Sequence, residues 1–279
     1  MPSAFLSDRA VIEIRGQDAE HFLQNLITTD VGALADGEAR PGALLTPQGK
    51  ILFEFLISRS VDGFHLETHE DQRDGLIRRL TMYKLRAAVE IKASATSGTT
   101  VFWGETELPQ GLRDHRFAVA GVDLVRIPGQ VGVAGPLAAY DALRVLVGVP
   151  DSGSDFALED VFPHDVLYDK ADGVSFRKGC YVGQEVVSRM QHRGTARRRL
   201  VLLSGDQPLP VPGSNLTVDG KPVGTLGTVV GQRGLAIARI DKIGEALAEG
   251  KDVLAGGIPV SATLPRWSGL NFPTRSDEA

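Results

Sequence analysis

Residues Ser214 to Ile240 read SNLTVDGKPVGTLGTVVGQRGLAIARI, a series of short β-prone segments separated by turn sequences. The turns are Asp-Gly and Gly-Gln-Arg-Gly, and valine, leucine, isoleucine and threonine are frequent between them. The same pattern occurs before this stretch in RRLVLLSG and after it in GIPVSATL, and only DKIGEALAEG is helix-prone. Residues 197–266 are therefore predicted to form a small all-β barrel or sandwich.

The chain before this barrel mixes strand and helix patterns. RAVIEIRG, ALLTPQGKILFEFLIS and GFHLETH predict strands, whereas DQRDGLIRRLTMYKL and LAAYDALRVLVG predict helices. Strands come in pairs between helices, which favours an α+β domain with a mainly antiparallel sheet over a doubly wound nucleotide fold. Neither GxGxxG after a strand nor GxxxxGK[ST] occurs. We predict a first domain of residues 1–196 and a second of residues 197–279.

Composition limits the class of protein. The net charge of −5 gives no global attraction to nucleic acid or to an anionic membrane. The single cysteine allows no internal disulfide and the chain has no zinc-type Cys/His spacing, so a reducing, cytoplasmic setting is expected. The sequence also shows no signal peptide and no apolar run of about 18 residues, so no membrane span is expected.

That cysteine lies in KGCYVGQEVVSRMQHRG, residues 178–194. A helix is predicted from Gln184 to a stop at Gly194, with Glu185 in its first turn and Arg189 four residues on. Cys180 would then precede a helix N-terminus, next to two basic side chains, in a place that suits a thiolate. The alternative is a small apolar residue buried in the core. Spacing leaves both readings open because no general base is identified.

The stretch KGCYVGQE resembles the signature of the YgfZ-type folate-binding proteins, Lys-Gly-Cys-(Tyr/Phe)-x-Gly-Gln-Glu. These proteins are related to the T-protein (aminomethyltransferase) of glycine cleavage. The matching residues are Lys178, Gly179, Cys180, Tyr181, Gly183, Gln184 and Glu185. The resemblance implies a tetrahydrofolate-binding N-terminal region and a C-terminal β-barrel. It also implies a role in making or maintaining iron–sulfur proteins, including enzymes that modify tRNA, with those proteins or their assembly factors as partners.

The resemblance also assigns folate contacts. Asp165 stands thirteen residues before Lys178, where the family has a glutamate that is expected to hold the pterin. A carboxylate can accept hydrogen bonds from the pterin N–H and amino group together. The alternative for Asp165 is an acid in a surface turn, and the neighbouring His164 is expected to point away. Tyr83 matches a family tyrosine that would stack on the folate ring, or it is a core aromatic on a helix.

GKILFEFL resembles the T-protein segment with two adjacent aspartates, one of them catalytic. Here Phe53 and Glu54 occupy those positions, which counts against one-carbon transfer. Glu54 is either a folate contact or a solvent-side strand residue. A folate-dependent aminomethyl- or methyltransferase is thus one alternative function.

A non-catalytic tRNA- or partner-binding module is the other alternative. Its basis is a set of basic residues that could attract phosphate or a folate glutamate tail, or could simply form a solvated linker. These residues are His192, Arg193, Arg197, Arg198 and Arg199.

Overall fold

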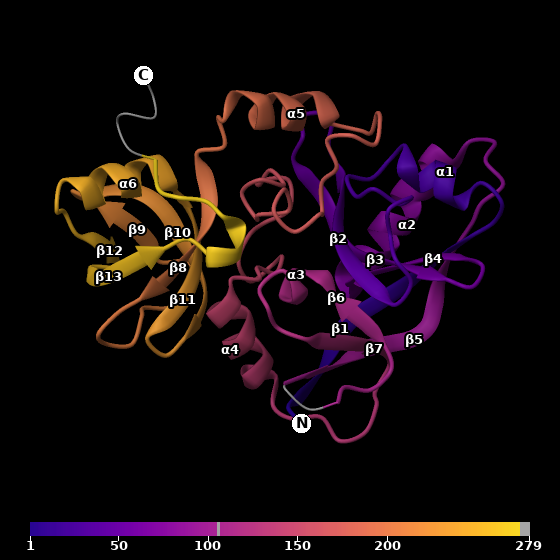
Figure 1. The fold of residues 1–279 in the computed structure, drawn as a ribbon, viewed down its shortest axis with the longest axis horizontal. Coiled ribbons are helices and arrows are strands. Elements are labelled where there is room, and N and C mark those ends of the chain that lie inside the picture. The colour runs from indigo at the N-terminus through magenta and orange to yellow at the C-terminus, as the bar shows by residue number, and fades with distance from the viewer. Residues whose placement is uncertain (105–106, 274–279) are drawn as a thin grey trace. The chain divides into compact units, whose positions relative to one another are not determined.

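The computed structural model describes residues 1–104 and 107–273. The chain divides into two compact units, the first made of Met1–Tyr140 and Ala171–Val186 and the second of Asp141–Lys170 and Val187–Ala279. Each unit contains a closed β-barrel (Figure 1). The segments 141–170 and 187–196 thus group with the C-terminal barrel, whereas the predicted division at residue 197 places them with the N-terminal region.

The first barrel has the strand order β1-β4-β3-β2-β6-β7-β5. Its strands are β1 (Ser3–Arg15), β2 (Glu38–Leu45), β3 (Ile51–Ser60), β4 (Gly63–His69), β5 (Glu90–Trp103), β6 (Leu112–Asp114) and β7 (Leu124–Pro128). Apart from the parallel pair β2–β6, its pairings are antiparallel, which confirms the predicted α+β class. The stretch from Glu90 to Trp103 is one continuous strand, β5.

Two helices of the first unit, α1 (Ala19–Gln24) and α2 (Glu70–Lys84), cover a hydrophobic cluster on one face of β1, β3 and β4 (Figure 1). Leu76 and Leu80 are fully buried there, as the helical spacing of the sequence requires. Each such leucine contributes about 1.5–3 kcal/mol by its burial. Asp18 lies at the N-cap position of α1 without a capping hydrogen bond; its carboxylate accepts from Ala88 N at 2.7 Å instead. A short helix, α3 (His115–Ala118), follows β6.

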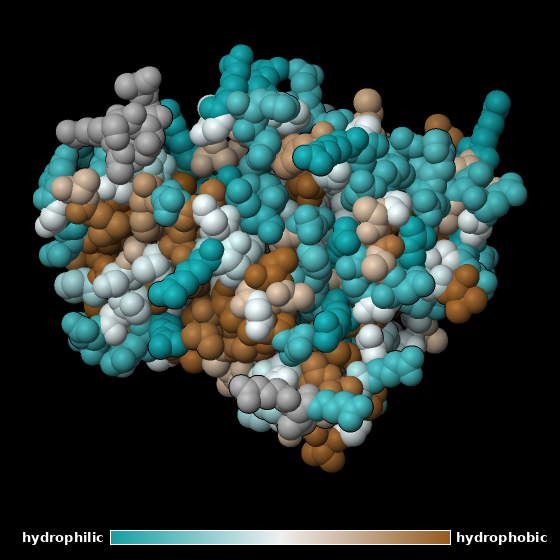
Figure 2. Space-filling view, in the orientation of Figure 1, coloured by the Kyte–Doolittle hydropathy of each residue, from teal (hydrophilic) through white to brown (hydrophobic). Residues whose placement is uncertain are grey.

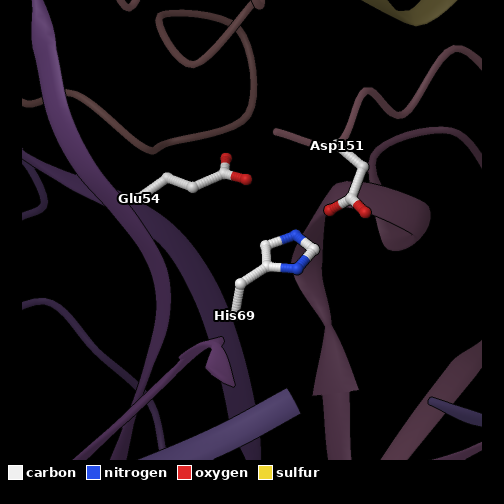
Figure 3. A group of neighbouring side chains, drawn as sticks. All are labelled: Glu54, His69 and Asp151. Carbon is white, nitrogen blue, oxygen red and sulfur yellow. The ribbon is translucent and has the colours of Figure 1, made fainter. Parts of the chain in front are cut away.

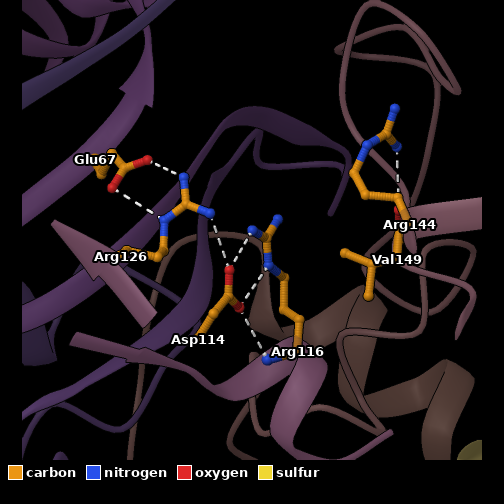
Figure 4. A network of polar contacts seen from close by, with 6 residues as sticks. All are labelled: Glu67, Asp114, Arg116, Arg126, Arg144 and Val149. Carbon is orange, nitrogen blue, oxygen red and sulfur yellow. Dashed lines mark hydrogen bonds and ion pairs between the residues drawn. The ribbon is translucent and has the colours of Figure 1, made fainter. Parts of the chain in front are cut away.

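A buried network of charges joins three strands of this barrel (Figure 4). Arg126 on β7 donates to Glu67 on β4 at 3.1 Å and to Asp114 on β6 at 3.1 Å. Arg116 donates to the same Asp114 carboxylate at 2.7 and 3.0 Å. Burial alone would raise the pKa of Asp114, but Arg116 and Arg126 outweigh it and hold that pKa below its usual range. The network therefore carries two positive and two negative charges.

The second barrel has the strand order β10-β11-β8-β13-β12-β9. Its strands are β8 (Arg198–Ser204), β9 (Asn215–Val218), β10 (Lys221–Val230), β11 (Arg233–Arg239), β12 (Val253–Ala255) and β13 (Ile258–Thr263). The helix α6 (Ile240–Ala248) follows β11, where the sequence predicts the only helix of this region, and the short 3-10 helix η1 (Arg266–Ser268) follows β13. The predicted small β-barrel is confirmed.

The segment 141–170 is held to this barrel by polar contacts. Asp155 accepts a hydrogen bond from Thr228 N on β10 at 2.7 Å and forms an ion pair with Arg144 at 2.9 Å. Arg144 lies on α4 (Leu137–Val147) and also donates to the Val149 carbonyl at 3.1 Å (Figure 4). A Cβ at Gly227 would come within 2.5 Å of Asp155, so this glycine is what permits the close approach.

Candidate functional site

The loop that carries the cysteine motif belongs to the first unit and leads into α5 (Gln184–Arg193). This helix has the predicted bounds, and Gly194 follows it with a left-handed φ of 60°. Cys180 is exposed, so it is not the small buried residue of the alternative reading. Gly179, beside it, has a φ of 102° and open space where a Cβ would be. The thiol is therefore accessible to a partner molecule.

Lys178 and Tyr181 fix the loop on both sides of the cysteine. Lys178 Nζ donates to the Thr29 carbonyl at 2.7 Å and lies 5.4 Å from the centre of the Tyr181 ring. Burial lowers the pKa of Lys178 to about 8, although nearby Asp30 raises it in part. The Tyr181 hydroxyl is buried and has no hydrogen-bond partner among the described residues, and its burial raises the pKa of Tyr181 to about 12.

The second glycine of the motif packs against the turn between β2 and β3. Gly183 has a φ of 77°, and a Cβ there would lie 2.5 Å from the Thr46 carbonyl oxygen. No other residue fits this position without moving the backbone. Gln184 then accepts a hydrogen bond from Tyr181 N at 3.3 Å, at the start of α5. The structure thus explains why the motif has a glycine at position 183 and a glutamine at position 184.

Glu185 and Arg189 are exposed on α5, over which hydrophilic side chains gather (Figure 2). These two motif residues are therefore not part of the buried packing of the loop.

Residues 173–175, just before the motif, form hydrogen bonds with Thr28, which follows α1. Thr28 Oγ1 donates to the Gly173 carbonyl at 2.6 Å, and Ser175 N donates to the Thr28 carbonyl at 2.9 Å. Thr29 supplies the carbonyl that Lys178 contacts. This Thr-Thr pair is not predicted as functional from the sequence, because two threonines in a loop after α1 carry no distinctive signal.

Glu54 is buried on β3 and points toward the ring of His69 at the end of β4 (Figure 3). A ligand atom of each side chain lies within 4.8 Å of the other. His69 Nδ1 also lies 3.3 Å from Asp8 Oδ2. Glu54 is therefore not a solvent-side residue. His69 and Asp8 are not predicted from the sequence, although a histidine as the last residue of a predicted strand is a visible signal.

Phe53 and Tyr83 lie elsewhere in the first unit. Both pack against the hydrophobic cluster under α1 and α2. The Phe53 ring lies 3.0 Å from where a Cβ of Gly75 on α2 would be, so this side chain contributes packing. Glu54 is the strand neighbour of Phe53, so its side chain points to the opposite face of the sheet. Tyr83 packs on the same cluster as Phe53, and the structure therefore does not bring Tyr83 together with Glu54.

Asp165 belongs to the second unit and is buried, so it is not a surface turn acid. Its Oδ2 accepts from Phe162 N at 3.1 Å and lies 3.9 Å from Arg198 Nε. The side chain of His164 is also buried, with its Nε2 3.2 Å from Gln191 Oε1, and burial lowers the pKa of His164. Asp165 thus organises its own turn.

The predicted basic patch is only partly available. Arg198 forms an ion pair with Asp160 at 3.0 Å, and buried Arg199 forms one with Asp169 at 2.6 Å. Arg193 and Arg197 are exposed. Two of the four arginines are therefore engaged within the second unit.

Two barrels, the first with helices on its outer face, define the class of protein. The fold is similar to that of glycine cleavage system aminomethyltransferase T from Bartonella henselae, with a TM-score of 0.71 and 18% identity over 95% of this chain and 85% of that one. Residues 197–270 match the family "CAF17, C-terminal beta-barrel domain". The chain is thus a T-protein-like fold with a C-terminal β-barrel domain.

Sequence similarity then defines the family. The chain is 30% identical to iron–sulfur cluster assembly factor IBA57, mitochondrial, of Homo sapiens, over 94% of this chain and 84% of the relative. It is also 30% identical to the protein of the same name in Mus musculus and 26% identical to the homologue in Coccidioides immitis. The chain belongs to the IBA57 family.

These comparisons refine one expectation and correct another. The relatives carry the IBA57 name and not that of the YgfZ type. The expected cytoplasmic location is wrong, because the same relatives are named mitochondrial. In the part of the chain that the structure describes, no helix has the length and apolar composition to span a membrane.

Proposed function

We propose that this protein takes part in the assembly of iron–sulfur proteins, with the Cys180 thiol as its contact with the cluster or with the protein that receives it. The observation that carries this proposal is an exposed thiol on a fixed loop in a chain whose relatives are named iron–sulfur cluster assembly factors. One cysteine supplies at most one soft ligand. The remaining ligands of a bound cluster come from a partner, from glutathione or from a second copy.

The test compares variants in cells that lack the native gene. We expect Cys180→Ser to lower the activity and iron content of iron–sulfur enzymes several-fold while the protein accumulates normally, because serine lacks a soft ligand atom. Met82→Ser is the matched control, since it removes an exposed sulfur from α2. Full enzyme activity with Cys180→Ser would overturn the role of the thiol.

A reduced folate, tetrahydrofolate, is the proposed cofactor, in keeping with the T-protein-like fold. Glu54 fits such a group, because it is a buried carboxylate beside a histidine and can accept from a pterin. Asp165 of the second unit is a separate candidate for the pterin acceptor that the family resemblance implies, because it too is a buried carboxylate. Tyr83 fits less well, given its packing on the hydrophobic cluster.

Calorimetric titration of the purified protein with tetrahydrofolate tests these two residues. Loss of one charge-assisted partner should weaken binding by about 1–3 kcal/mol in Asp165→Asn and in Glu54→Gln. Asp160→Asn, an exposed acid of the second unit, should bind as the wild type does. Unchanged affinity in either variant would remove that residue from the folate site.

The two alternative functions have weaker support. Phe53 packs against α2 and leaves Glu54 without a neighbouring carboxylate at the T-protein position, so aminomethyl transfer should give no turnover. Two arginines of the basic patch are paired, which leaves few phosphate contacts for a tRNA.

A further inference from the structure

The second unit carries two surface grooves that differ in charge. One, of about 300 Å³, lies beside α6, and its charged residues are largely paired: Lys251 with Asp219 and Glu249, and Lys242 with Glu245. The other, of about 440 Å³, lies between α4, the β8–β13 edge and η1. Its lining includes arginines but no acid. We call it the arginine groove.

Apolar and basic side chains both line the arginine groove. We call the apolar lining residues Val145 of α4 and Leu202 of β8 its floor, and the two lining arginines its rim. Arg233 and Arg266 are exposed on the rim, and neither forms an ion pair or hydrogen bond through its side chain with another described residue. Two exposed arginines thus stand beside apolar side chains in a chain with a net charge of −5.

An apolar side chain is also exposed at this groove. Leu146 of α4 has 54% of its surface accessible, and hydrophobic side chains are visible over α4 (Figure 2). Ser204 and Thr263 add two exposed hydroxyl groups to the lining. A ligand here would meet two fork-shaped cations, two hydroxyls and a hydrophobic strip.

We propose that the arginine groove docks an extended acidic segment of a partner protein, with its carboxylates on Arg233 and Arg266 and an apolar side chain on the floor. Arginine binds carboxylates through two parallel hydrogen bonds, which fixes orientation as well as adding affinity. Five of the eight lining residues are exposed, so the groove is open along its length and fits a peptide better than an enclosed small molecule. None of the lining residues belongs to the loop that carries Cys180, so the proposal does not depend on the role of the thiol.

The test uses the full chain and a fluorescein-labelled peptide of alternating glutamate and leucine, followed by anisotropy. We expect micromolar binding that weakens with salt, and at least a tenfold loss in Arg233→Ala/Arg266→Ala. A glutamate–serine peptide should bind several-fold more weakly, since it lacks the apolar side chains. Leu146→Asp should also weaken binding, because it places a negative charge at the groove.

Controls separate the groove from general charge effects. Lys221→Ala/Lys251→Ala removes two lysines from the other groove and should leave affinity unchanged. Thermal unfolding should show that the double arginine variant is folded. Equal binding by that variant, or an equal loss in the lysine control, would overturn the proposal. A second result would also overturn it: the wild-type protein binds no peptide and forms a dimer that the double arginine substitution dissociates. The occupant of the groove would then be a second copy of the chain.

Discussion

Lys178 and Tyr181 flank the exposed cysteine, and burial shifts their pKa values so as to disfavour the charged form of each. The pKa of Lys178 is lowered from about 10.5 to about 8 in the folded chain. Between these values the unfolded chain binds more protons, so the contribution of Lys178 to stability rises with pH and is lost as pH falls through 8. Tyr181 acts in the opposite sense above pH 10, because its pKa is raised to about 12.

The free energy of unfolding should therefore contain a rise between pH 7.5 and 9.5 that depends on Lys178. Replacing it in Lys178→Met should remove a rise on the order of 1–2 kcal/mol. Urea unfolding at the two pH values measures the difference, below the range in which Tyr181 titrates. Lys221→Met, an exposed lysine, should keep the wild-type rise. The same rise in Lys178→Met would mean that the motif lysine is not its source.

At the scale of elements, the buried network of the first barrel links β4 to the paired strands β6 and β7 through charged side chains. Asp114 accepts from both Arg116 and Arg126, and it also accepts from the backbone N–H of Arg116 at the start of α3. Its neutralisation leaves two buried guanidinium groups with Glu67 as their only acid in the network.

Asp114→Asn should therefore destabilise the protein by about 3–5 kcal/mol, the cost of breaking a buried ion pair from one side. Urea unfolding at neutral pH measures the change. Asp123→Asn is the control, because Asp123 pairs with Arg113 at an exposed site, and such pairs contribute about 0–1 kcal/mol. A similarly small loss in Asp114→Asn would show that water or rearrangement compensates the arginines.

Local patterns predicted the elements well and their partners poorly. GFHLETH corresponds to β4 and QEVVSRMQHR to α5, because strand alternation and a glycine stop are local signals. By contrast, VDLVRIP gives no sign that Arg126 is buried, since its acids come from residues 59 and 12 positions away. The motif also identified the loop that holds Cys180, but not the Thr29 carbonyl that fixes Lys178 from 149 positions away.

At the scale of the whole molecule, the division into two units differs from the boundary at residue 197 that the sequence pattern predicts. Composition changes at residue 197, where the family match also begins. Residues 141–170 nevertheless pack with the barrel that follows. Arg199 of β8 donates to the His164 carbonyl at 2.7 Å and pairs with Asp169, and Gly148 lies against Pro265 and Leu202. A barrel cut at 197 would lose these partners.

Two fragments test this division. Residues 197–279 alone would leave Arg199 without its acid and Thr228 N without Asp155, and would expose Leu202 and Pro265. Residues 141–279 keep all of these contacts. Since 1 kcal/mol corresponds to about 4–8 °C in a domain of this size, we expect the longer fragment to melt roughly 10 °C higher. Circular dichroism measures both melts, and Arg199→Met in the longer fragment should reproduce part of the loss, because it leaves Asp169 without its arginine. Equal melting temperatures would instead support a boundary at residue 197.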